Sequence, residues 1–348
     1  MIFDQGLIRN ILVIKLRAIG DVLLSTVVLE SLRSAFPDAK LDFLTERQSQ
    51  EVVEGNPALS SVIIFDAKNE NATGLILKVR RQQYDLVIDL FGNPRSALIT
   101  LLSGARYRVG YRFGWRKYCY NVVTEPRGDR VHNVDFNLDA LRRIGIPITG
   151  TRLRFPITPA ADRFAKDFFE GEQIADKFVI ALNPGGGWLT KRWRDRHFAH
   201  LGDTLVEKLG ATVLVVWGPG EARMAGEIRN LMRHPATLIP PCNLKQLASI
   251  LSRCGMLVTN DTGPMHIAAA VGTPVVAIFG PTNPLLQGPV GAPNEVIQNQ
   301  NLLCLGCNFT RCPIGNPCME ELPAEEVFAG VQRLVSRNSL AFHHESAE

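Results

Sequence analysis

Short apolar runs alternate with segments of helical periodicity along most of this 348-residue chain. The runs are rich in Val, Ile and Leu, and Gly, Pro or polar residues bound them. The segments between them carry apolar residues every three or four positions, as a helix packed on a sheet requires. This alternation is typical of βαβ units, in which successive strands join one parallel sheet. The sequence therefore predicts an α/β fold.

The runs fall into two groups, which predicts two sheets in two domains. Expected strands in the first half span residues 10–16, 40–45, 62–65, 85–90 and 108–111. Those in the second half span residues 178–183, 211–217, 236–239, 256–260, 274–279 and 295–298. A proline-rich stretch without a long periodic run indicates the junction. The predicted parts are an N-terminal domain 1–155, a linker 156–177, a C-terminal domain 178–322, a helix 323–338 and a tail 339–348.

Composition narrows the class of protein. The chain has 46% hydrophobic residues, 29 Gly and 21 Pro, which is ordinary for a globular protein. No apolar run approaches the roughly 20 residues that a membrane-spanning helix needs. The first ten residues, MIFDQGLIRN, include an acid and no long apolar stretch, unlike a secretory signal. A cytoplasmic protein is expected.

Polar or glycine-rich loops follow four of the expected strands. They read RAIGD, NPGGGWLTKRW, WGPGE and NDTGPMH, in chain order. Ligands bind at the carboxyl ends of parallel strands, where such loops lead into helices. Three of the four loops belong to the second domain, so the main ligand site is expected there.

The loop NDTGPMH combines a helix start with features of an anion site. Its helix signals are Asp261 or Thr262 as N-cap, Pro264 in the first turn and Gly272 at the end. A buried, well-capped helix explains these residues but leaves His266 and the Gly263 amide unexplained. Unpaired N–H groups and the helix dipole both favour an anion at such an end.

The other two loops of this domain support a nucleoside diphosphate as ligand. Gly186 and Gly187 would let backbone N–H groups approach phosphate oxygens closely, and Lys191 would add a positive charge. The lysine could equally belong to a plain basic loop. Glu221 follows the next strand, where a carboxylate can accept hydrogen bonds from ribose hydroxyls.

Common nucleotide fingerprints are absent from the sequence. The loop reads GGGWLT where the dinucleotide pattern ends in glycine, which leaves an oxidoreductase as a weak alternative. No Walker A pattern occurs, which excludes a P-loop NTPase. No Asp-x-Asp pair is present to hold a divalent ion on a diphosphate.

Two further clusters need an explanation. Six cations and no acid lie between residues 95 and 117, interleaved with aromatic residues, as in a solvated loop or a site for an anionic partner. Four cysteines, with spacing unlike that of a bacterial ferredoxin, lie within fifteen residues: Cys304, Cys307, Cys312 and Cys318. Free thiols and a bound metal are both open for them.

Three stretches, taken in order, resemble one known family. They are ILVIKLRAIGDVLLSTVVLESLRSAFPDAKLDFLTE, NPGGGWLTKRWRDRHF and NDTGPMHIAAAVGTPVVAIFGPTNP. The set resembles the ADP-heptose:lipopolysaccharide heptosyltransferases, glycosyltransferase family nine, over almost the whole chain. The resemblance implies a GT-B fold, with two Rossmann-like, doubly wound parallel-sheet domains facing across a cleft. It also implies a donor site in the C-terminal domain and an acceptor site in the N-terminal one.

Residue roles follow from the resemblance. Asp21 looks like the catalytic base, with the N-cap of a helix over 22–36 as its alternative role. Lys191 resembles the family's phosphate-binding lysine. The other implied donor-binding residues are Gly186, Gly187, Glu221, Cys242, Asp261, Thr262, Gly263 and His266. The expected acceptor-binding residues are Arg108, Arg112 and Arg116.

The implied reaction is an inverting, metal-independent transfer. It moves a heptose from ADP-heptose to the inner core of lipopolysaccharide, either Kdo-lipid A or a heptosylated acceptor. Peripheral contact with the cytoplasmic face of the inner membrane is expected, with no cofactor, no bound metal in the site and no nucleic-acid partner. The alternatives are a nucleotide-sugar epimerase of the same fold, a dinucleotide-dependent oxidoreductase and a non-catalytic nucleotide-binding module.

Overall fold

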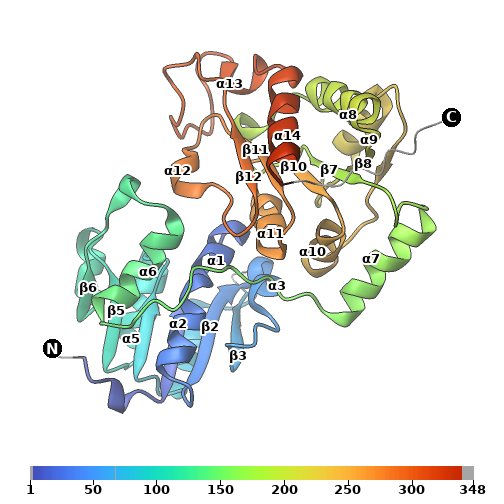
Figure 1. The fold of residues 1–348 in the computed structure, drawn as a ribbon. Helices are drawn as coiled ribbons and strands as arrows, with labels where there is room; N and C mark the ends of the chain where they lie inside the picture. The colour runs from blue at the N-terminus through green and yellow to red at the C-terminus, as the bar shows by residue number, and fades with distance from the viewer. Residues whose placement is uncertain (1–2, 67, 339–348) are drawn as a thin grey trace. The chain divides into compact units, whose positions relative to one another are not determined.

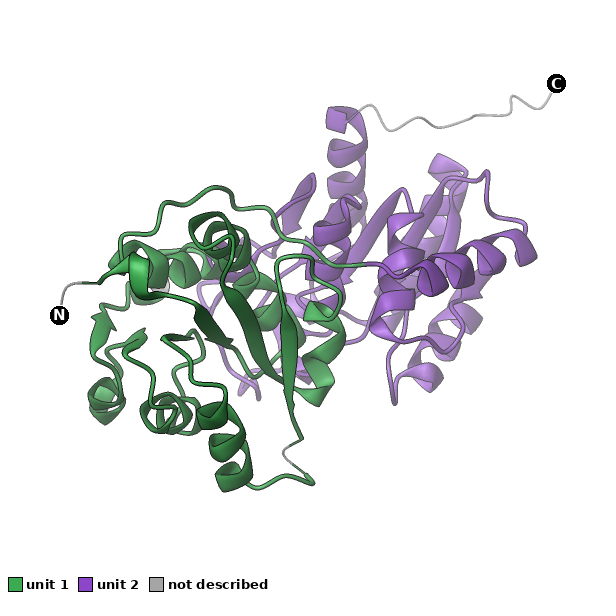
Figure 2. Ribbon diagram, turned by 90° about the horizontal axis from the view of Figure 1, so that it is seen from below, with its two compact units in different colours: residues 1–156 green, residues 157–348 purple. Residues whose placement is uncertain are grey.

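The structure is a computed structural model that describes residues 3–66 and 68–338. The chain divides into two compact units, residues 1–156 and 157–348 (Figure 2). The expected tail 339–348 lies outside the described residues. Within the described part, no helix has both the length and the apolar character needed to cross a membrane.

Unit 1 is built on one six-stranded sheet with the order β3-β2-β1-β4-β5-β6, all pairs parallel (Figure 1). The strands are β1 (Asn10–Ile14), β2 (Lys40–Glu46), β3 (Ser61–Phe65), β4 (Leu86–Asp89), β5 (Tyr107–Tyr111) and β6 (Val122–Thr124). This order is doubly wound, because the chain starts in the middle and builds outward in both directions.

The helices of unit 1 form two groups that cover opposite faces of its sheet. One group is α1 (Ile19–Ser25), α2 (Val27–Ala35), α3 (Gln50–Val53) and α6 (Asn133–Arg143), which contact one another. The other is α4 (Ala72–Arg81), α5 (Pro94–Leu102) and the 3₁₀ helix η3 (Gly114–Cys119). Right-handed crossovers explain the division, because the chain reverses its direction across the sheet after β3.

Unit 2 repeats the architecture with the order β12-β11-β10-β7-β8-β9, again parallel throughout. Its strands are β7 (Val179–Asn183), β8 (Thr212–Val215), β9 (Ala236–Leu238), β10 (Met256–Asn260), β11 (Val275–Ile278) and β12 (Asn294–Ile297). Its helices are α7 (Pro159–Gly171), α8 (Asp195–Leu209), α9 (Ala222–Leu231), α10 (Leu244–Ser252), α11 (Gly263–Val271), α12 (Pro284–Gln287), α13 (Pro317–Glu320) and α14 (Ala324–Asn338).

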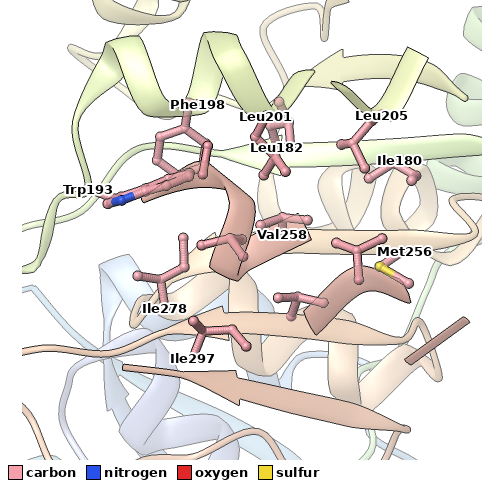
Figure 3. Packing of buried hydrophobic residues seen from close by; sticks show 14 of the residues in the cluster. Ile180, Leu182, Trp193, Phe198, Leu201, Leu205, Met256, Val258, Ile278 and Ile297 are labelled. Atoms are coloured by element: carbon pink, nitrogen blue, oxygen red, sulfur yellow. The ribbon is translucent and has the colours of Figure 1, made fainter. Parts of the chain in front are cut away.

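The core of unit 2 is organised around Trp193, at the end of the glycine-rich loop (Figure 3). Its ring meets Phe198 of α8 edge-to-face, with 4.9 Å between ring centroids. The indole Nε1–H donates to the carbonyl of Leu322 at 2.9 Å, so this buried polar atom is satisfied. Leu182 of β7 and Val258 of β10 pack in the same cluster. The loop is therefore anchored in the core just where it returns from the sheet edge.

The sequence predicted eleven strands, and all eleven are present within two residues at each end. The short strand β6 was missed, because three residues carry no readable periodicity. The expected helix over 22–36 is two helices, α1 and α2, joined at Thr26. Asp21 is the third residue of α1, and its N-cap is Ala18, so the N-cap alternative for Asp21 is wrong.

The segment 156–177, predicted as a linker region because no long periodic run was found there, contains helix α7. Thr158 accepts a hydrogen bond from the amide of Ala161 and caps this helix, and Pro159 stands in its first turn. Its buried positions include Ala161, Ala165 and Phe169, which keep a helical spacing. Alanines contribute weakly to a hydrophobic pattern, which is why the periodicity was overlooked.

Two helical glycines of unit 2 provide a matched test of its packing. A Cβ at Gly330 in α14 would fall against the side chain of Ile297 in β12, whereas a Cβ at Gly226 in α9 would meet open space. We expect Gly330→Ala to lower the free energy of unfolding by about 1–3 kcal/mol through overpacking. Gly226→Ala should raise it by about 0.5–1 kcal/mol, because alanine favours a helix. Urea unfolding of both variants checks this, and equal shifts would contradict the packing described.

Candidate functional site

The carboxyl edge of the unit 2 sheet carries a buried ion pair. Lys191 Nζ lies 2.6 Å from Asp261 Oδ2, and the two side chains are 14% and 5% exposed. Thr282, in the loop after β11, donates its hydroxyl proton to the same carboxylate oxygen at 2.7 Å. Lys191 also lies over the ring of Trp188, 4.7 Å from its centroid. Three loops of the sheet thus meet at one charged centre.

Two asparagines at the strand ends hold these loops in place. Asn260 donates to the carbonyls of Pro184 and Gly185 and accepts from the Trp193 amide at 3.1 Å. Asn183 donates to the hydroxyls of Thr259 and Thr262 at 2.8 and 2.9 Å. Neither asparagine was predicted as a site residue. Both lie buried at strand ends next to the quoted loops, a position that could have drawn attention to them.

Glu221 joins two glycine loops of unit 2. Its carboxylate accepts from the amide of Gly186 at 3.0 Å and from that of Gly218 at 2.9 Å. Arg192 donates to the carbonyl of Gly186 and lies 3.7 Å from the same carboxylate. Glu221 therefore contacts one of the amides predicted to bind phosphate. The Gly186 amide is an anion-binding group, and a carboxylate of the protein is the anion that it holds here.

Helix α11 begins at this charged centre, as predicted. Thr262 is its N-cap residue, Pro264 stands in its first turn, and Gly272 ends it in the left-handed conformation with φ of 91°. No side chain caps the helix, because the Thr262 hydroxyl bonds to Asn183 and to the Asn260 carbonyl instead. The uncapped start directs backbone N–H groups and the positive end of the helix dipole toward the loop edge.

The remaining predicted donor residues have the following positions. Gly263 is the first residue of α11, and His266 is buried in the same helix. Gly187 lies in the glycine loop, and nothing lies within 4 Å of a Cβ placed there. Cys242 is partly buried immediately before Asn243, the N-cap of α10. Gly186, Gly187 and Lys191 belong to the glycine loop after β7. Asp261, Thr262, Gly263 and His266 belong to the turn after β10 and the helix α11 that follows it.

The cysteine-rich segment packs against this edge without metal-ligand geometry. Among the described residues no group of three or more His, Cys, Asp or Glu side chains could hold a metal ion, and all seven cysteines are free. The amides of Gly306 and Asn308 donate to the carbonyls of Gly280 and Pro281. Burial, with the nearby thiols of the segment, raises the pKa of Cys318 to about 11. The segment therefore supports the loop that carries Thr282, and its buried Cys318 thiol is protonated near neutral pH.

Unit 1 has its own charged cluster at the carboxyl edge of its sheet. Lys15, directly after β1, is partly buried and donates to the carbonyl of Leu90 at 3.0 Å. Asp89 ends β4 and accepts from the Tyr120 hydroxyl at 2.7 Å and from the amides of Phe91 and Gly92. Asp21 in α1 is half-buried, and the Ala18 amide donates to it across a long 3.5 Å contact.

Burial and charge act against each other in this cluster. Burial lowers the pKa of Lys15, while the carboxylates of Asp21 and Asp89 raise it. Burial raises the pKa of Asp89, and hydrogen bonds led by that from the Gly92 amide oppose the shift. Sequence reasoning found Asp21 but missed Lys15 and Asp89. A lysine at the end of an otherwise apolar strand was the available signal, since burying a charge is costly unless it has a function or a partner.

The three arginines predicted to bind an acceptor lie in different environments. Arg108 donates to the carbonyls of Cys119 and Ala105, and Arg116 donates to those of Phe113 and Gly92. Arg112 pairs with Glu125 at 2.6 Å, and both side chains are at least half exposed. Only Arg112 of the three forms an ion pair that solvent reaches freely. An anionic ligand that reaches Arg112 from solvent would compete with the Glu125 carboxylate, and an exposed ion pair of this kind is weak.

The buried pair in unit 2 can be tested by a double-mutant cycle. Lys191→Met would leave the Asp261 carboxylate buried beside a hydroxyl alone, which is expected to cost about 3 kcal/mol in the free energy of unfolding. Adding Asp261→Asn should recover part of that loss, giving a coupling of about 1–3 kcal/mol. Urea unfolding of the two single variants and the double variant measures it. Additive effects would show that the two side chains do not interact as described.

The lowered pKa of Lys15 predicts a pH-dependent stability. The folded chain binds this proton less tightly than the unfolded chain, so the contribution of Lys15 to the free energy of unfolding is smallest below its lowered pKa. That contribution should rise as the pH increases toward 10.5, the ordinary lysine value. The difference in stability between wild type and Lys15→Met, measured by urea unfolding from neutral to alkaline pH, should therefore grow in favour of wild type. A constant difference would contradict the burial of a charged amine.

Comparisons with known proteins agree with this geometry. The family model for glycosyltransferase family 9 (heptosyltransferase) matches residues 73–316. Lipopolysaccharide heptosyltransferase 3 of Escherichia coli is 25% identical over 344 residues, covering 92% of this chain and 96% of that protein.

Solved structures show the same fold. A glycosyltransferase of family 9 from Veillonella parvula superposes with a TM-score of 0.84 at 26% identity, covering 95% of this chain and 98% of that one. An Escherichia coli heptosyltransferase, solved with ADP-2-deoxy-2-fluoro heptose, gives a TM-score of 0.71 at 21% identity over 93% of this chain and 99% of that one. The GT-B fold class predicted from the sequence is confirmed. This chain belongs to glycosyltransferase family 9, the heptosyltransferases.

Proposed function

We propose that this glycosyltransferase moves a heptose from ADP-heptose to the inner core of lipopolysaccharide. Its family, and curated relatives such as lipopolysaccharide heptosyltransferase 3, support this substrate class. A protein of similar fold was solved with a fluorinated ADP-heptose, which supports ADP-heptose as the donor. The observation that carries the proposal is the buried Lys191–Asp261 pair at the start of α11.

Unit 2 is assigned the donor. The uncapped start of α11 and the ammonium group of Lys191 offer positive charge to a diphosphate, and the Gly263 amide begins that helix. Loss of ADP leaves negative charge on the diphosphate, and donors already in place stabilise it without reorganisation. We assign this work to protein groups alone, because the chain has no Asp-x-Asp pair of the kind that holds a divalent ion. Glu221, now on the Gly186 and Gly218 amides, is assigned to the ribose hydroxyls.

Unit 1 is assigned the acceptor and the base. Asp21 would take the proton of the acceptor hydroxyl. At the same time the oxygen of that hydroxyl would bond to the anomeric carbon of the heptose, and the bond from this carbon to ADP would break. A single displacement of this kind inverts the anomeric centre. The Asp21 carboxylate raises the pKa of Lys15, so the charge of this lysine interacts with the assigned base. Arg112, with Arg108 and Arg116, is assigned to the acid groups of the acceptor.

Three other functions fit less well. A nucleotide-sugar epimerase would need no glycolipid acceptor and is not favoured by the family. A dinucleotide-dependent oxidoreductase would need the third glycine that the 185–190 loop lacks. A non-catalytic nucleotide-binding module would retain its function without Asp21. We place the protein at the cytoplasmic face of the inner membrane, where a lipid-linked acceptor would be reached.

Substitution of Asp21 tests the assignment of the base. Asp21→Asn keeps the size of the side chain and should reduce transfer by about 10²–10⁴-fold while ADP still binds. Transfer is measured by mass spectrometry of the acceptor sugar, and ADP binding by calorimetry. Asp38→Asn, at an exposed turn, is the control and should match wild type. Full turnover by Asp21→Asn would refute the assignment of the base.

The same transfer assay tests the role of Arg112. Arg112→Gln should raise the KM for the acceptor and leave the KM for the donor unchanged.

A further inference from the structure

The layer of α4, α5 and η3 on the unit 1 sheet has an unusual outer surface. Its inner side packs in the core through Leu75, Val79 and Ile99. Its outer side exposes large apolar or aromatic side chains, each between 39% and 75% accessible: Leu77, Leu98, Leu101, Leu102, Trp115 and Tyr118. We call this surface the α4–α5–η3 face. Six such side chains on one layer are more than scattered surface residues explain.

Helix α5 carries an apolar stripe on its exposed side. Its exposed positions are Pro94, Arg95, Leu98, Leu101 and Leu102, which recur every three or four residues and so form one stripe. A helix on the surface of a water-soluble protein normally presents polar side chains there. This stripe has a single charge, Arg95, which lies at its N-terminal end. The exposed side of the helix is therefore at least as apolar as its buried side, which consists of Ser96, Ala97, Ile99 and Thr100.

Positive charge exceeds negative charge in the segment that carries the face, although Glu125 pairs with Arg112 and Glu46 with Arg95 from outside that segment. Residues 71–124 contain nine Lys or Arg and two Asp, a net charge of nine minus two, or +7. Asp89 is buried, and Asp85 accepts the amides of Arg9 and Asn10, so neither acid stands out on the surface. Lys117 lies over the Tyr118 ring at 5.0 Å, which places a cation beside an exposed aromatic side chain. Apolar and positive groups thus share the same surface.

We propose that the α4–α5–η3 face binds a phospholipid bilayer that carries anionic headgroups. The leucine side chains would insert at the boundary between headgroups and acyl chains. Trp and Tyr side chains would lie at the level of the headgroups, because their rings are apolar but carry one polar group. Lysine and arginine bind anionic headgroups, with about 1 kcal/mol for each cation near the surface. The face supplies all three kinds of group.

Two other occupants fit the face less well. Single-stranded nucleic acid would use the cations and rings but would gain little from the leucine stripe of α5. In a symmetric dimer through this surface, two copies of the segment 71–124, each with a net charge of +7, would face each other. Their repulsion opposes such a dimer. The inference deepens the proposed function, because a glycolipid acceptor resides in a bilayer. It does not depend on transfer, since vesicle binding needs neither donor nor acceptor.

Flotation of the full chain with vesicles tests the proposal. Wild type should float with phosphatidylcholine vesicles containing phosphatidylglycerol, and far less with phosphatidylcholine alone. Leu98→Ser with Leu102→Ser should lower partitioning onto anionic vesicles about tenfold, because the apolar stripe is removed. Arg106→Gln with Lys117→Gln should lower it by a similar factor and weaken its dependence on salt.

Matched controls come from unit 2. Leu231→Ser with Leu285→Ser removes two leucines that are 56% and 78% exposed, and Arg223→Gln with Arg229→Gln removes two exposed cations. Both control pairs should bind vesicles like wild type, and circular dichroism should show every variant folded. Failure of wild type to float, or equal loss in the control pairs, would overturn the proposal. It would also be overturned if the leucine variants lost self-association or oligonucleotide binding instead of vesicle binding.

Discussion

The functional edge of unit 2 depends on one buried ion pair, between Lys191 and Asp261. The lysine comes from the glycine loop after β7, the aspartate precedes α11, and Thr282 reaches the same carboxylate from the loop after β11. Breaking the pair would leave a charge in a dry environment, so each loop is held in place by the other two. The asparagines at the ends of β7 and β10 fix the backbone that carries these side chains. Preorganisation of this kind suits a site where a leaving diphosphate must be stabilised as it forms.

Unit 1 uses burial in a different way. Asp89 is fully buried and Lys15 is partly buried. Burial raises the pKa of Asp89 and lowers that of Lys15, which favours the neutral form of each group. Asp21, half-buried in the first turn of α1, lies at the border of this cluster. The Asp21 carboxylate raises the pKa of Lys15, so these two charges interact, and the Asp21 side chain is only half-buried, as a base that must reach an acceptor requires. The outer side of the same unit carries the cationic and apolar face, so the assigned base and the proposed bilayer contact belong to one unit.

Much of the fold could be predicted from the sequence because parallel strands buried on both faces leave clear apolar runs. The turn into α11 was equally legible, since Thr262, Pro264 and Gly272 each have a strong positional preference. Helix α7 was not predicted, because the alanines at its buried positions contribute weakly to a hydrophobic pattern. The loops of the site were found from their glycines and charges. Their partners Asn183, Asn260 and Thr282 were missed, because a hydrogen bond between residues 21 to 79 apart leaves no local pattern. Lys15 and Asp89 were missed for the same reason, as only the β1–β4 pairing brings them to one edge.

The central claim is that the Lys191–Asp261 centre of unit 2 binds the diphosphate of the donor. Calorimetric titration of ADP into wild type and into Lys191→Met tests it most directly, with Arg223→Gln as a charge-matched control. The account predicts that wild type and the control bind ADP alike, and that Lys191→Met binds it at least about tenfold more weakly, as the loss of one charge-assisted contact implies. Equal affinity of Lys191→Met and wild type for ADP would contradict it.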